Sequence, residues 1–166
     1  MWVAVAAAAP ERLSGLMLID AAGEFTGAPP GALEQFSHAL ETDACREVIT
    51  DTFEANLVRA APATRDLVLR NLEDMDPRLV AAAYRSLLAY RPLARLSRFA
   101  GPTLLVGDAN NDSSFSLHAQ APQLAWRGVA GTSHWIMLDQ PGRFHRILDD
   151  FLAGIPVRSS GMQAGA

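Results

Sequence analysis

The sequence has 166 residues, of which 49% are hydrophobic and 19% are charged, and its formal net charge is −4. These values fit one globular domain with a sizeable core and exclude a wholly disordered chain. The acidic balance gives no indication of a nucleic-acid partner. The single cysteine, Cys45, excludes an internal disulfide, and with it a small secreted fold stapled by disulfides.

The first segment of the chain, residues 1–9, is rich in alanine and apolar on every side, which predicts a buried helix that ends at Pro10. This segment lacks the basic start of a secretory signal peptide. No apolar run approaches the length that a membrane-spanning helix needs. We therefore expect a cytoplasmic protein without a membrane partner.

Three segments of the sequence predict strands. Residues 13–20 form a continuous apolar run that ends in a carboxylate, which is typical of a strand buried on both faces. Residues 102–107 have a strand-like composition, and residues 123–129 (QLAWRGV) read as another strand. Residues 115–122, between the second and third of these segments, could hold a short helix. After the third segment, the pattern of residues 141–152 predicts an amphipathic helix with one apolar side.

The stretch between the first two strands, residues 32–98, differs in character. Its apolar side chains recur at helical spacing, and the alternation typical of strands is absent. Asp43, Thr64 and Asp76 each stand at a plausible helix start, and Pro77 occupies a first helical position. This pattern predicts three or four helices with no strand between them.

Strands that alternate with helices predict an α/β protein with a parallel sheet and flanking helices. The predicted strands are too few for a complete sheet of this kind, so we expect a partial one. The expected organisation is a partial α/β core over residues 1–23 and 99–155, a helical insertion over 24–98, and a disordered tail over 156–166.

Polar side chains follow each predicted strand. Asp20 follows the first strand, Asp108 and Asp112 follow the second, and His134 follows the third. Reactive groups collect at the carboxyl ends of strands in open parallel sheets. A carboxylate that meets the imidazole there would orient the ring and stabilise its protonated form, so the histidine would act as a general base.

Several segments resemble α/β-hydrolase-fold enzymes. Residues 7–20 resemble the segment that follows the nucleophile elbow of that family, and residues 102–107 resemble the strand that precedes its catalytic acid. Residues 131–135 (GTSHW) and 138–141 (LDQP), followed by 150–152 (DFL), resemble its catalytic-histidine loop and last helix. The helical insertion lies where the family places a cap over its active site.

This resemblance implies the C-terminal portion of an α/β-hydrolase fold, with an inserted all-helical cap. It implies hydrolysis of an ester or lactone of a small, largely apolar substrate by a nucleophile, an acid and a histidine, without a metal or an organic cofactor. The family's Gly-x-Ser-x-Gly elbow is absent from these 166 residues. The nature of the nucleophile, serine, cysteine or aspartate, therefore stays open.

The resemblance leaves the catalytic acid open. The family commonly places it three residues after the glycine that ends the strand, and Asn110 occupies this position. An insertion of two residues would make the acid Asp112, which we favour, and Asp108 is an alternative. Some family members place the acid after the earlier strand, which would point to Asp20 or Glu24. Asparagine and aspartate also favour turns, so this loop could be a polar turn without a catalytic role.

By the same resemblance, His134 would be the catalytic histidine, and Trp135 would line the substrate site or pack beneath it. Ser133 does not lie on a strand-to-helix elbow, so we do not expect it to be the nucleophile. His118 and His145 have no partner at the spacing of metal ligands, and no metal site is expected.

A second hypothesis gives the chain no catalytic activity. In this alternative the chain is a binding or assembly module built on half of a domain. The edge of a partial sheet would be apolar and would pair with a second copy of the chain or with a complementing chain.

Overall fold

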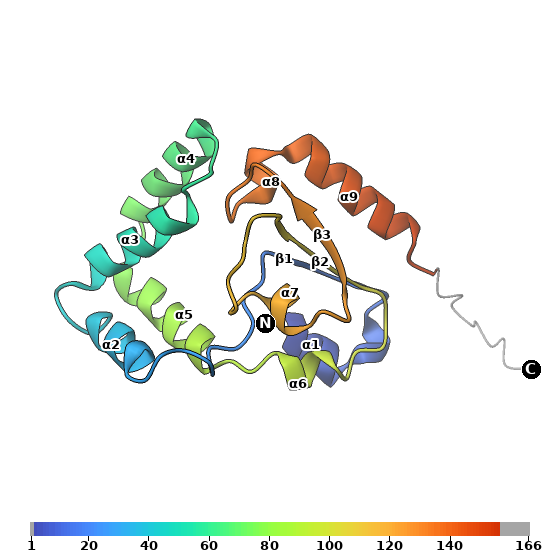
Figure 1. Cartoon of the computed structure of the whole chain (residues 1–166), viewed down its shortest axis with the longest axis horizontal. Coiled ribbons are helices and arrows are strands. Elements are labelled where there is room, and N and C mark those ends of the chain that lie inside the picture. The colour runs from blue at the N-terminus through green and yellow to red at the C-terminus, as the bar shows by residue number, and fades with distance from the viewer. Residues whose placement is uncertain (1, 157–166) are drawn as a thin grey trace, which may run out of the picture.

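The computed structural model of the chain describes residues 2–156, so all but the first residue of the tail expected to be disordered lies outside the described residues. Figure 1 shows a small sheet with helices on both faces and a group of helices beside it. The α/β class predicted from the sequence is confirmed. None of the helices in the described part combines the length and apolarity needed to cross a bilayer.

The sheet has three strands in the order β1-β2-β3, and both neighbouring pairs are parallel. The strands are β1 (Leu16–Ile19), β2 (Thr103–Asp108) and β3 (Ala125–Val129). The three predicted strands are therefore present. Strand β1 is shorter than predicted because the chain before it forms a turn of 3₁₀ helix, η1 (Pro10–Arg12), and joins β2 only at Leu16.

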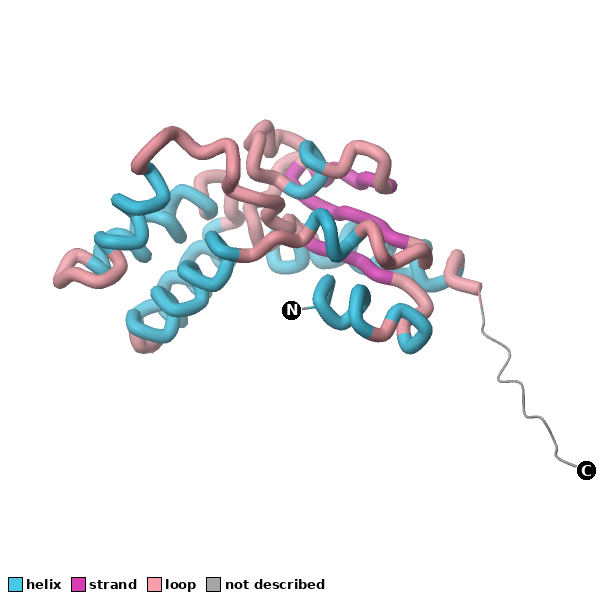
Figure 2. Tube along the Cα trace, turned by 90° about the horizontal axis from the view of Figure 1, so that it is seen from below, coloured by secondary structure: helices cyan, strands magenta, loops and turns pink. Residues whose placement is uncertain are grey.

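Side chains alternate between the two faces of the sheet. On one face, Leu16 and Leu105 pack beneath α1 (Trp2–Ala8), α6 (Leu93–Leu96) and α7 (Leu117–Gln120). On the other face, Leu104 and Val106 pack beneath α8 (Ile136–Asp139) and α9 (Pro141–Ala153). Figure 2 shows the strands with α1 beside one face. Burial on both faces explains why β2 reads as a continuous apolar run. Strand β3 at the edge of the sheet instead alternates between exposed and less exposed residues and contains Arg127.

The helices beside the sheet, which we call the helical block, are α2 (Ala32–Ala39), α3 (Cys45–Asn56), α4 (Pro62–Glu73) and α5 (Pro77–Ala89). They enclose their own apolar cluster, whose buried members are Leu40, Ile49, Leu72, Val80 and Ala81. Cys45 packs against this cluster. As predicted, no strand interrupts residues 32–98, but the structure has five helices there, α2–α6, instead of three or four. The additional short helix, α6, packs against α1 of the sheet layer.

Only one of the three predicted helix starts is correct. The side chain of Asp76 accepts a hydrogen bond from the backbone of Arg78 at 2.9 Å, and Pro77 begins α5. Helix α3 instead starts at Cys45 and α4 at Pro62, so the starts predicted at Asp43 and Thr64 are wrong. Thr64 lies inside α4, and its side chain forms a hydrogen bond with Asp139, as described below.

The cap at Asp76 gives a first prediction. We expect Asp76→Ala to lower the free energy of unfolding by about 1 kcal/mol, because the orphan amide at the start of α5 loses its acceptor. Chemical denaturation measures this change. Asp74→Ala is the matched control, since Asp74 is an exposed aspartate two residues away that caps no helix start. An equal loss in both variants would contradict the assigned cap.

Candidate functional site

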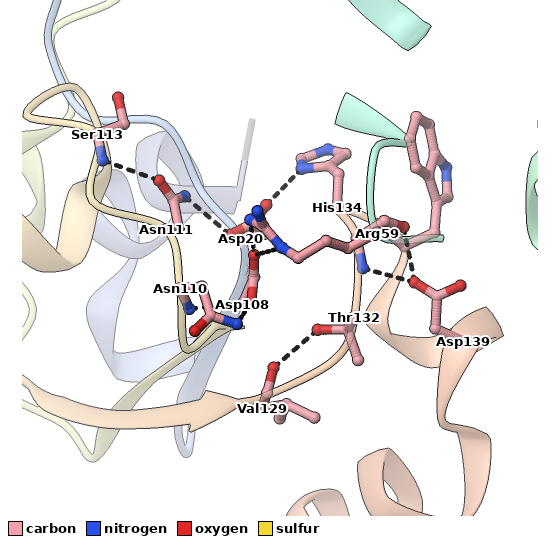
Figure 3. Close-up of polar contacts among 12 residues, drawn as sticks. Asp20, Arg59, Asp108, Asn110, Asn111, Ser113, Val129, Thr132, His134 and Asp139 are labelled. Atoms are coloured by element: carbon pink, nitrogen blue, oxygen red, sulfur yellow. Dashed lines mark hydrogen bonds and ion pairs between the residues drawn. The ribbon is translucent and has the colours of Figure 1, made fainter. Parts of the chain in front are cut away.

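The candidate site is built on a contact between Asp20 and His134. Asp20 follows β1 directly, and His134 lies in the loop between β3 and α8. The Nδ1 atom of His134 lies 2.7 Å from Oδ2 of Asp20 (Figure 3). An ionised carboxylate only accepts hydrogen bonds, so Nδ1 carries the hydrogen and Nε2 is the basic nitrogen of the neutral ring. The pair has the geometry of a general base with its orienting carboxylate.

Asp20 is held in an unusual backbone conformation. Its φ is +40°, in the left-handed region that aspartate tolerates better than most residues. Its N–H donates to the carbonyl of Val106 at 2.6 Å, which extends the pairing of β1 with β2. Its second carboxylate oxygen accepts a long hydrogen bond of 3.4 Å from Asn111. Such strained positions cluster at functional sites, where the surrounding structure fixes them.

Gly107 makes room for the Asp20 carboxylate. A Cβ atom at position 107 would lie 2.9 Å from Oδ1 of Asp20 and 2.4 Å from the ring of Trp126. Both distances are shorter than real Cβ contacts, so any side chain there would displace one of these groups. The glycine in β2 thus allows the carboxylate to lie against the end of the sheet.

Hydrogen bonds hold the loop that carries His134 on two sides. Asp139 accepts hydrogen bonds from both the backbone N–H and the hydroxyl of Ser133, each at 2.7 Å. Its other oxygen accepts from the backbone of Ala61 at 2.9 Å, directly before α4, and Thr64 adds a side-chain hydrogen bond. The N–H of His134 donates to the carbonyl of Asn56 at 3.3 Å. The loop is therefore attached to the helical block as well as to the sheet.

The hydrogen bonds to Asp139 change its acidity. Burial alone would raise the pKa of Asp139, but the hydrogen bonds from Ser133, Ala61 and Thr64 stabilise the charged form more strongly. The net result is a pKa below the usual value for aspartate. Asp139 is therefore ionised while it holds the loop.

Trp135 packs beside the catalytic candidates. Its ring meets the His134 ring edge-on, with centroids 5.1 Å apart, and lies 5.7 Å from the ring of Phe53 in α3. Trp135 thus supports the histidine and joins the loop to the helical block. It does not line either of the two cavities described below.

Asp108 does not contact His134. It forms an ion pair with Arg59, whose Nε donates at 2.8 Å, and its other oxygen accepts from the backbone of Asn110 at 3.0 Å. Side chains alternate along β2, so Asp108 points to the opposite face from Gly107, beside which Asp20 lies. Its side chain is only 4% exposed. The geometry gives Asp108 an anchoring role for Arg59.

Asp112, which the sequence favoured as the acid, is exposed and makes no hydrogen bond to His134. From the same loop it is Asn111 that reaches Asp20, and its side-chain oxygen accepts from the backbone of Ser113 at 3.1 Å. Glu24 lies elsewhere and accepts from the backbone of Leu93 at 3.2 Å. The structure therefore pairs His134 with Asp20, the alternative placed after the first strand, instead of Asp112 or Asp108.

Two cavities meet at the Asp20–His134 pair. Both are lined by Asp20, Asn56, Asn111 and His134. The small cavity, of about 180 Å³, adds Arg59, Asp108 and Ser133. The large cavity, of about 450 Å³, extends between the helical block and the sheet and adds mostly apolar side chains. The larger volume lies within the roughly 300–1,000 Å³ that small-molecule sites occupy.

Four aromatic rings line the large cavity. Phe25 and Phe115 stack with centroids 5.3 Å apart, and Phe36 and Tyr84 meet edge-on at 5.7 Å. Burial raises the pKa of Tyr84, so this phenol is neutral. The aromatic walls favour an apolar ligand.

Comparison with known proteins does not identify the chain, since no protein-family model and no curated protein matches it. Within residues 2–156, no three histidine, cysteine, aspartate or glutamate side chains are grouped so that they could hold a metal ion.

The hydrogen bonds to Asp139 predict a pH-dependent contribution to stability. Because the folded-state pKa is lowered, this contribution is complete above the unfolded pKa of about 4 and is lost as the pH falls through the folded value. We expect Asp139→Asn to lower the free energy of unfolding by about 2 kcal/mol at pH 7 and by clearly less at pH 3. Urea denaturation at both pH values measures the difference.

The exposed Asp149 on α9 provides the control, because Asp149→Asn should change stability little at either pH. A deficit of Asp139→Asn that is the same at pH 7 and pH 3 would contradict the assigned role of the ionised carboxylate.

Proposed function

We propose that this chain is an α/β-hydrolase-type protein that hydrolyses an ester or lactone of a small apolar substrate, with His134 as general base and Asp20 as its orienting acid. The observation that carries the proposal is the 2.7 Å contact between Nδ1 of His134 and Oδ2 of Asp20 at the junction of two cavities. A histidine oriented in this way by a carboxylate is the arrangement that acyl-transfer chemistry uses.

The arrangement of the elements supports the family assignment. The helical block is inserted between β1 and β2, and the acid and histidine follow the outer strands of a parallel sheet. Helices α2–α5 would then be the cap that the resemblance implies. The acid would follow the earlier strand, as in those family members that place it there.

The proposed reaction needs one proton acceptor and one donor. Nε2 of neutral His134 takes a proton from an attacking hydroxyl or water as its oxygen bonds to the carbonyl carbon. Asp20 stabilises the imidazolium that forms. When the tetrahedral intermediate breaks its bond to the leaving oxygen, the imidazolium returns the proton to it and the acid product remains.

The nucleophile is the open part of this scheme. Within residues 2–156, Nε2 of His134 receives no hydrogen bond from a serine or cysteine side chain. Among residues 2–156 no side chain is placed to attack, so we assign water as the nucleophile in this scheme. General-base catalysis alone contributes on the order of a hundredfold to ten-thousandfold, so we expect slow turnover of activated esters.

Hydrolysis of p-nitrophenyl butyrate by the purified chain tests the proposal. We expect His134→Ala to reduce turnover to the rate in buffer. Asp20→Asn keeps the size of the side chain and tolerates a positive φ, but it removes the charge that stabilises the imidazolium, so we expect a loss of about tenfold or more. The release of p-nitrophenol, followed by its absorbance, gives the rates.

His145→Ala is the matched control, because His145 is exposed on α9 and lines neither cavity. Its turnover should equal that of the unchanged chain. Turnover that falls equally in the His134 and His145 variants would indicate unspecific imidazole catalysis and would refute the proposal.

The location of the substrate gives a further prediction. Leu88 lies on α5 and lines the large cavity, whereas Leu79 on the same helix is 70% exposed. We expect Leu88→Trp to raise the KM for p-nitrophenyl butyrate about tenfold by filling the cavity, because an apolar group of this size gains about 1–3 kcal/mol from its site. Leu79→Trp should leave KM unchanged, and equal effects of the two substitutions would place the substrate elsewhere.

One observation favours the alternative, a catalytically silent assembly module. Within residues 2–156, β1 pairs only with β2, so its other edge presents unpaired backbone groups. In this case a second copy of the chain or a complementing chain would pair with that edge. Absence of ester turnover together with a defined dimer in light scattering would support this alternative over the hydrolase.

A further inference from the structure

We propose that the small cavity is a subsite for a neutral group that accepts hydrogen bonds, so that the chain selects uncharged two-part substrates and rejects those with a carboxylate at this end. The inference rests on the proposed function for the position of the cleaved bond. The binding preference itself follows from the residues of the small cavity.

The junction of the cavities divides the substrate into two parts. His134 lines both cavities, together with Asp20, Asn56 and Asn111. A substrate whose reacting carbon lies beside His134 therefore extends one part into each cavity. The large cavity, with its aromatic walls, takes the apolar part, and the small cavity takes a group of few atoms.

Two hydrogen-bond donors of the small cavity are uncommitted. Arg59 uses Nε and Nη2 for Asp108, and Nη1 contacts no acceptor within the described residues. The side-chain amide of Asn56 makes no hydrogen bond within residues 2–156, although its backbone carbonyl binds His134. By contrast, the amide of Asn111 is occupied by Asp20 and Ser113. A carbonyl or ether oxygen could thus accept from Arg59 or Asn56.

The charges of the small cavity oppose an anion. Asp20 and Asp108 contribute two negative charges and Arg59 one positive charge, so the formal charge is −1 while His134 is neutral. The side chain of Asp108 is 4% exposed and forms an ion pair with Arg59. A carboxylate would meet a guanidinium that is already paired and would face two carboxylates, whereas a neutral acceptor gains hydrogen bonds without this repulsion.

Phenylacetamide and phenylacetate test the preference. The two molecules have the same size and the same aromatic part, and neither carries an ester for the chain to cleave. We expect calorimetric titration of the intact chain at pH 7.5 to show phenylacetamide binding about tenfold more tightly, the ratio that one modest charge repulsion produces. Asn56→Ala should weaken phenylacetamide about fivefold by removing one neutral donor.

Asp108→Asn changes the formal charge of the small cavity from −1 to 0 without changing the size of the side chain. It should strengthen phenylacetate binding about tenfold and leave phenylacetamide nearly unchanged, because Arg59 is then no longer neutralised. Circular dichroism checks that this variant folds. If it does not fold, the comparison of the two ligands on the unchanged chain and on Asn56→Ala still decides the matter.

Two results would overturn the inference: phenylacetate binding as tightly as phenylacetamide, or neither ligand binding. Failure of the proposed function looks different. Binding with the expected preference but without ester turnover would refute the hydrolase and leave the subsite standing. Ester turnover with a preference for the carboxylate would refute the subsite alone.

Discussion

The site depends on a contact that spans the sheet. Asp20 and His134 follow β1 and β3, which are not neighbours, because β2 lies between them. The two side chains meet at 2.7 Å only by crossing the end of β2. Gly107 in that strand has no side chain to obstruct the carboxylate, and the left-handed backbone of Asp20 turns the chain at the point where β1 ends. The contact between Asp20 and His134 therefore requires three features together: the parallel order of the strands, the glycine in β2 and the left-handed backbone of Asp20.

The short connection between α3 and α4 holds the other side of the site. Asn56 accepts from the backbone of His134, Arg59 pairs with Asp108, and Ala61 donates to Asp139. Three of the site's attachments therefore come from six consecutive residues of the helical block. Both cavities lie between this block and the sheet. The position of the block therefore determines the shape of the cavities and also the position of His134.

Much of this fold follows from the sequence alone, but the site follows only in part. Apolar runs predicted β1 and β2, a less apolar segment predicted the edge strand β3, and the sequence around His134 marked the histidine. The choice among Asp20, Asp108 and Asp112 depended on side-chain alternation and on one backbone angle, which composition does not encode. The role of Arg59 was not predictable because it arises from a contact between residues 49 positions apart. A single turn such as α8 is too short to leave a periodic signal.

The two carboxylates at the end of the sheet, Asp20 and Asp108, differ in how many hydrogen bonds their oxygens already accept. Asp108 has both oxygens occupied, one by the Arg59 guanidinium and the other by Asn110, so it has no strong acceptor site left for an imidazole. Within the described part of the chain, one oxygen of Asp20 accepts a long 3.4 Å hydrogen bond from Asn111, and the other lies against His134. A carboxylate orients a histidine only when one of its oxygens is free to accept. The environment of each aspartate, more than its distance along the chain from a strand, therefore assigns its role.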